Sequence, residues 1–131
     1  MSNTTKKCVI YAKVKPEEQG IIPVRLKEYA EKIGFEVIAG FFEQDKSNVE
    51  FEKMLKFIDT VPNVSAVFEK ISRQYKDLPK YYSICEKDHT LYFRKQNFYM
   101  TKEMLPTPFK QAVDNAFITA MQEAAKELKN G

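Results

Sequence analysis

CVIYAKVKPEEQ, the stretch from Cys8 to Gln19, is an apolar segment that runs directly into a charged one. Residues 8–12 have the length and composition of a short buried strand. Lys13, Lys15 and further polar residues follow at once. In open α/β sheets, sites form where the strands reach their carboxyl ends. The stretch therefore predicts a first strand and one edge of a site.

Strand-like and helix-like periods alternate along the rest of the chain. Strands joined by helices predict parallel βαβ units, and right-handed crossovers place the helices on both faces of the sheet. We therefore expect one α/β domain over residues 1–131, with three layers (α/β/α) and a mainly parallel sheet. The expected strands are 7–12, 35–42, 64–69 and 90–94, and the expected helices are 22–33, 48–58, 78–85 and 109–129.

The bulk composition limits the classes of function. The chain has 131 residues, 44% of them apolar, and a net charge of +3, which is far from the excess of a dedicated nucleic-acid binder. Cys8 and Cys85 lie in apolar segments and predict core residues in a reducing cytoplasm, with no disulfide and no metal. His89 has no partner at ligand spacing and predicts a surface or capping role. No apolar run predicts a membrane span, and the absence of a Gly-rich loop argues against a nucleotide cofactor.

A second polar loop, KISRQYK at 70–76, follows the third expected strand. The carboxyl ends of neighbouring parallel strands meet at one edge of a sheet. Lys13, Lys15, Arg73 and Lys76 are therefore expected to converge there. Arginine offers a planar fork and lysine a mobile charge, so the group would suit a phosphate. The same lysines could instead form a solvated turn.

The first of these loops resembles the start of the catalytic domain of serine recombinases, the resolvase/invertase family. That family opens with Tyr-x-Arg-x-Ser, and the serine attacks DNA. Tyr11 matches the tyrosine, Lys13 takes the place of the arginine and Lys15 that of the serine. Gln19 falls on a glutamine that is common in the family's first loop.

The second loop resembles the family's Asp-Arg-x-x-Arg motif. Arg73 and Lys76 fall on its two arginines, and Ser72 takes the place of its aspartate. The resemblance covers roughly residues 7–102. It implies a resolvase-like domain with the strand order 2-1-3-4, and Tyr11 with the two loops as a degenerate site.

The departures from the motif bear on function. Lysine cannot replace serine as a reversible phosphodiester nucleophile, and exchanging arginine for lysine loses bidentate geometry. The loop 43–48 also lacks the glycine that family members often carry there. No catalytic residue of the family site is therefore intact. The resemblance implies a catalytically inactive accessory or regulatory protein of a mobile element, associated with DNA or with an active recombinase.

The expected partners follow from the same reasoning. No separate DNA-binding domain is expected after the last helix, so binding to DNA would be weak and non-specific. Residues 70–102 carry eight basic and three acidic side chains, which indicates either a DNA-facing surface or an ordinary solvated one. Two alternatives stay open: a protein-interaction module without DNA, and a small enzyme that uses Lys15 as an amine nucleophile or phosphate clamp.

The expected last helix, 109–129, has an apolar stripe. In recombinases the helix at this place mediates dimer contacts, and the resemblance implies the same use here. The stripe could equally dock on the sheet. The candidate interface residues are Phe109, Val113, Phe117 and Met121.

Overall fold

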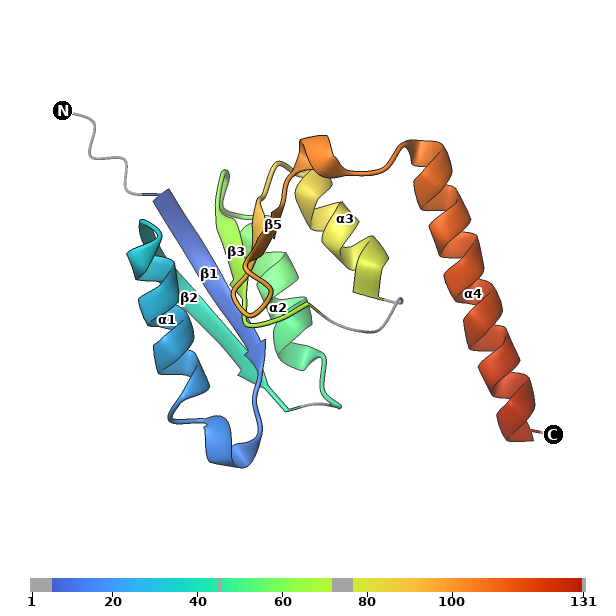
Figure 1. Ribbon diagram of the computed structural model, residues 1–131, viewed down its shortest axis with the longest axis horizontal. Helices are drawn as coiled ribbons and strands as arrows, with labels where there is room; N and C mark the ends of the chain where they lie inside the picture. Colours follow the sequence, from blue (N-terminus) through green and yellow to red (C-terminus); the bar gives the residue numbers. More distant parts are fainter. Residues whose placement is uncertain (1–5, 45, 72–76, 131) are drawn as a thin grey trace.

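The computed structural model describes residues 6–44, 46–71 and 77–130, which form an α/β fold around one five-stranded sheet (Figure 1). The strand order is β2-β1-β3-β4-β5, and the first four of these strands are parallel to one another. The predicted mainly parallel sheet and its order 2-1-3-4 are confirmed. The strands are β1 (Lys6–Lys13), β2 (Phe35–Glu43), β3 (Ser65–Phe68), β4 (Leu91–Phe93) and β5 (Phe98–Met100).

Helices cover both faces of this sheet, so the fold has three layers. On one face, α1 (Ile22–Lys32) packs with Leu26 and Ala30 against β1 and β2. On the other face, α2 (Val49–Ile58) and α3 (Leu78–Glu86) bury their apolar sides against β1, β3 and β4. Successive residues of a strand point to opposite faces, and burial on both faces explains the nearly continuous apolar runs.

The end of α1 shows how the sequence sets a boundary. Gly34 follows the helix with a φ of 101°, in the left-handed region that side chains disfavour. A glycine just past the last helical turn is a common stop signal. The chain can therefore turn directly into β2, which begins at Phe35.

The fifth strand was not expected from the sequence. β5 pairs antiparallel with β4, with Tyr92 opposite Tyr99. Phe98, Tyr99 and Met100 are too few to show a period. Asn97 has a φ of 50°, which asparagine tolerates better than most residues and which helps the chain reverse.

The two cysteines and the histidine are all buried. Cys8 and Cys85 are free thiols within the core, as predicted. Burial, helped by Glu31, raises the pKa of Cys8 to about 12; burial, helped by Glu86, raises that of Cys85 to about 11. The surface position that was one of the two expectations for His89 is wrong, because the residue is buried. Its Nδ1 lies 2.8 Å from the backbone oxygen of Val64, which gives the buried ring a polar partner.

The last helix, α4 (Pro108–Asn130), stands out from the three layers (Figure 1). It follows a short 3-10 turn, η3 (Lys102–Met104). The Tyr82 hydroxyl of α3 lies 3.4 Å from Asp114 Oδ2 of α4. Within the described part of the chain, no helix is both long and apolar enough to cross a membrane.

Candidate functional site

The first loop leaves the sheet at the carboxyl end of β1. Lys15 directly precedes a single 3-10 turn, η1 (Pro16–Glu18), and its backbone N–H donates to Glu18 Oε1 at 2.8 Å. The Glu18 carboxylate therefore fixes the backbone of the loop. The side chains of Lys15 and Gln19 are exposed, whereas Lys13 is half-buried. The loop thus presents a backbone held by Glu18 and a solvent-facing lysine, Lys15.

Tyr11 anchors this edge from within the core. Its ring packs against Phe51 and Phe68, each with a centroid separation of 5.4 Å, and its hydroxyl donates to Glu43 Oε2. Burial raises the pKa of Tyr11, and the hydrogen bond to Glu43 raises it further. Tyr11 is therefore a buried phenol that supports the edge rather than a group that faces a ligand.

Glu43 is the buried carboxylate that joins β1, β2 and α2. Besides Tyr11, it accepts the Ser47 hydroxyl at 2.9 Å and the backbone N–H groups of Glu50 and Phe51 at 2.9 and 3.1 Å. The last two donors belong to the first turn of α2, so the Glu43 carboxylate caps the start of this helix. Sequence reasoning missed this role. The feature of the sequence that could have indicated this role is an acidic residue at the end of an apolar strand.

Lys13 extends the same connection at the surface. Its Nζ donates to Asn48 Oδ1 at 3.2 Å, which links the end of β1 to the residue that precedes α2. Tyr11 and Lys13 belong to the last residues of β1 and Lys15 follows it, so all three lie at the carboxyl end of this strand. Gln19 lies beyond η1 in the same loop.

The second loop is described only up to Ile71. Ser72, Arg73 and Lys76 lie outside the described residues, so their predicted convergence with the lysines stays a prediction. Lys70 is exposed at the start of the loop. The backbone N–H of Ile71 donates to Gln96 Oε1 at 3.0 Å, which ties the loop to the turn between β4 and β5.

Glu69, just past β3, is the centre of a charged cluster that sequence reasoning missed. Arg94 donates to both its carboxylate oxygens at 2.7 Å, and Arg25 of α1 donates to Oε2 at 2.8 Å. Burial alone would raise the pKa of Glu69, but the hydrogen bonds and charges of the two arginines outweigh it and lower that pKa. The same carboxylate raises the pKa of Arg94. The signal was again an acid at the end of an apolar strand.

Several basic side chains of residues 70–102 pair with acids, and Glu52, Asp59 and Glu69 lie outside this segment. Arg94 pairs with Glu69, Lys87 with Asp59 at 2.8 Å, and Lys102 with Asp88 at 3.9 Å. Lys80 lies near Glu52 and Asp77. The count along the sequence therefore overstates the positive charge of this segment.

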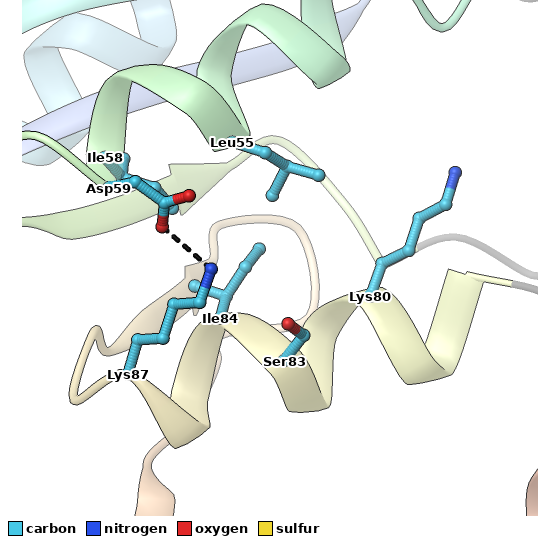
Figure 2. Close-up of a pocket in the computed structure, with 7 residues that line it drawn as sticks. All are labelled: Leu55, Ile58, Asp59, Lys80, Ser83, Ile84 and Lys87. Atoms are coloured by element: carbon cyan, nitrogen blue, oxygen red, sulfur yellow. Dashed lines mark hydrogen bonds and ion pairs between the residues drawn. The ribbon is translucent and has the colours of Figure 1, made fainter.

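A shallow groove lies between α2 and α3, away from the strand ends (Figure 2). Its cavity volume is about 110 Å³, and Leu55, Ile58 and Ile84 provide its apolar lining. Figure 2 shows the Lys87 ammonium reaching across to Asp59. The Lys80 ammonium, by contrast, lies 5.2 Å from the centre of the Phe51 ring. The two lysines of this small groove already contact groups of α2 or the residue after it, so the groove is a weaker candidate for ligand binding than the carboxyl end of β1.

The interface candidates on α4 are exposed, apart from Phe109, whose side chain lies outside the described residues. Val113 is 46%, Phe117 56% and Met121 47% exposed. Docking of this stripe on the sheet, one of the two expectations, is therefore not what the structure shows.

The fold and its edge define a class of protein: a three-layer α/β domain with lysines at the carboxyl end of its first strand. Among the described residues, no group of three or more His, Cys, Asp or Glu side chains could hold a metal ion. Comparisons with protein-family models, curated proteins and solved structures found no match to this chain.

Proposed function

We propose that this protein is a catalytically inactive, serine-recombinase-like domain that associates with DNA phosphates at the carboxyl edge of its sheet. It would act as an accessory or regulatory factor, in keeping with the mobile-element role that the resemblance implies. The single observation that carries the proposal is the position of Lys15. An exposed lysine stands just past β1, where the family motif has its serine.

The architecture supports the same proposal. The resemblance implies the strand order 2-1-3-4, and the four parallel strands have that order. The polar residues of the first motif fall at or just beyond the end of the first strand, where such sites form. A resolvase-like ancestry accounts for the fold and for the placement of the first motif together.

Lys15 is better suited to hold a phosphate than to attack one. A lysine becomes a nucleophile where burial or neighbouring cations remove its proton. Lys15 is exposed, and Glu17 and Glu18 follow it in the same loop. Its ammonium can contribute a point charge to a phosphate, and such contacts depend strongly on salt. The structure therefore favours binding over the alternative of a lysine-dependent enzyme.

The exposed stripe on α4 supports a second part of the proposal, which is association with another copy of the chain. Val113, Phe117 and Met121 are spaced four residues apart and lie on one side of a helix that stands out from the layers. Apolar side chains at this spacing favour helix–helix packing. A dimer would also bring two weak phosphate sites to one DNA, which increases affinity without new contacts.

Lys15→Glu tests the DNA-binding proposal. Electrophoretic mobility shifts with a labelled duplex at low and high salt should show weak binding by the wild type that salt abolishes. We expect the variant to bind several-fold more weakly and to reduce the slope of log affinity against log salt by about 1. Lys56→Glu is the matched control, because Lys56 is exposed in the last turn of α2, near the opposite edge of the sheet.

Two results would contradict the proposal. One is equal loss of binding in the Lys15 and Lys56 variants, which would show an effect of net charge alone. The other is a covalent protein–DNA adduct on a denaturing gel with supercoiled plasmid, which would show that the protein cleaves DNA.

A further inference from the structure

One end of the sheet is open on the face that α1 covers. α1 packs on β2, β1 and β3, whereas α2 and α3 lie on the opposite face. Among the described helices, α1 is the one that packs on this side, so β4 and β5 extend beyond it (Figure 1). Aromatic and cationic side chains gather where this uncovered surface meets α1. We call it the open-face patch, and its residues are Arg25, Tyr29, Tyr92, Arg94 and Tyr99.

The tyrosines form an aromatic surface in which Tyr92 is packed and Tyr99 is exposed. Tyr92 and Tyr99 are opposite each other on β4 and β5, with ring centroids 6.1 Å apart and planes tilted by 33°. Tyr92 also packs edge-on against Phe35 at 5.3 Å. Burial raises the pKa of Tyr92, and the nearby phenols of Tyr29 and Tyr99 add to the effect. Tyr92 is thus held in place, while Tyr99 is 54% exposed and offers its ring to solvent.

The cations of the patch are held by Glu69. Its carboxylate binds Nε and Nη2 of Arg94 and Nη2 of Arg25, which fixes both guanidinium groups beside the tyrosines. Both arginines remain partly exposed. Each guanidinium has five N–H donors, and the carboxylate uses only some of them. The patch therefore presents oriented cationic donors next to an exposed ring.

The surrounding charge favours an anionic ligand. Lys70 and Lys95 directly follow Glu69 and Arg94 in the chain, and both are exposed. The strand ends at this corner thus carry three cations, and Arg25 of α1 adds a fourth, against one buried carboxylate. An exposed ring beside cations is the combination that binds unpaired nucleotides, because bases stack on aromatic faces and phosphates bind the cations. The bases of a duplex are already stacked on each other and cannot use such a ring.

We infer that the open-face patch binds single-stranded nucleic acid, with a base stacked on Tyr99 and phosphates held by Arg25 and Arg94. The inference is independent of the phosphate site proposed at Lys15, which lies at the end of β1. It uses a different part of the sheet and selects a different form of nucleic acid.

Fluorescence anisotropy with labelled oligothymidine, oligouridine and a duplex of equal length tests the inference. We expect the wild type to bind at least one of the single strands more tightly than the duplex. Tyr99→Ala should weaken single-strand binding at least about fivefold, because a stacking contribution is lost. Tyr99→Phe keeps the aromatic face and should bind as the wild type does. Lys56→Glu, away from the patch, serves as the control for net charge.

The outcomes separate this inference from the proposed function. Duplex binding that depends on Lys15, together with no binding of either single strand, would overturn the inference and leave the proposed function standing. Equal single-strand binding by Tyr99→Ala and Tyr99→Phe would also overturn it. Single-strand binding lost only in Tyr99→Ala would support it, even if the duplex does not bind. Circular dichroism of each variant verifies that the fold is intact.

Discussion

At the scale of single residues, two buried carboxylates organise the candidate site. Glu43 accepts hydrogen bonds from Tyr11 of β1 and from the first turn of α2. Glu69 forms ion pairs with both Arg25 and Arg94. Carboxylates are rarely buried unless they are paired in this way. Each joins elements that are distant in sequence: Glu43 holds Tyr11 against the start of α2, and Glu69 holds Arg25 of α1 next to Arg94. The residues most visible in the sequence, Lys13 and Lys15, are held by other groups, Asn48 and Glu18.

Because the two arginines lower the pKa of Glu69, the free energy of unfolding should decrease at acid pH. The pKa of Glu69 is lower in the folded chain than in the unfolded chain, where it is about 4.5. The ionised carboxylate therefore stabilises the fold above about pH 4.5, and this stabilisation is lost as the pH falls through the pKa of the folded state. Glu69→Gln should destabilise the protein at pH 7 by about 1 to 3 kcal/mol, a range moderated by the partial exposure of both arginines. Urea unfolding at a series of pH values measures both effects.

The difference in unfolding free energy between wild type and Glu69→Gln should shrink as the pH falls below about 4.5. Glu28→Gln is a suitable control, since Glu28 is an exposed acid of α1 near Arg25 in the chain. A difference that stays constant down to pH 2 would show that charge at Glu69 does not contribute to stability.

At the scale of elements, the strands and helices with clear periods could be predicted, and the short ones could not. α1 repeats apolar residues at helical spacing over several turns, and β1 is an unbroken apolar run, so each is visible without tertiary context. β5 has three residues, and its pairing with β4 decides that it is a strand. Its position creates the open face at this end of the sheet.

α4 shows a different limit of sequence reasoning. An apolar stripe predicts that a helix is covered by something, but it does not identify the covering surface. Two coverings were equally compatible with the pattern, and the structure leaves Val113 and Met121 about half exposed.

The double substitution Val113→Glu and Met121→Glu tests the role of α4. If α4 pairs with a second copy, sedimentation should show a concentration-dependent dimer for the wild type and a monomer for the variant. The unfolding free energy of the isolated subunit should change by less than about 0.5 kcal/mol, because both side chains are exposed. Asn115→Glu, on another side of the same helix, should still dimerise. A wild type that remains monomeric at high concentration would contradict the pairing.

At the scale of the whole molecule, the sequence predicted the layers, the parallel strand order and the edge where polar residues gather. The layers follow from periodicity and from rules about crossovers, which act along the chain, whereas the strand order was implied by the resemblance to serine recombinases. The partners of the charged groups could not be predicted, since Arg25 and Glu69 are 44 residues apart in sequence. For the same reason, the count of charges in residues 70–102 left a DNA-facing surface and an ordinary solvated one equally open. Ion pairs are a property of the folded surface.

The central claim is that the carboxyl edge of β1 binds DNA phosphates without cutting DNA. An NMR titration of the isotope-labelled protein with a short duplex at low salt tests it most directly. The account predicts that the backbone amides from Lys13 to Gln19 show the largest chemical-shift changes, and that added salt reverses them. Unchanged amides in this loop at saturating DNA, with changes confined to other surfaces, would contradict it.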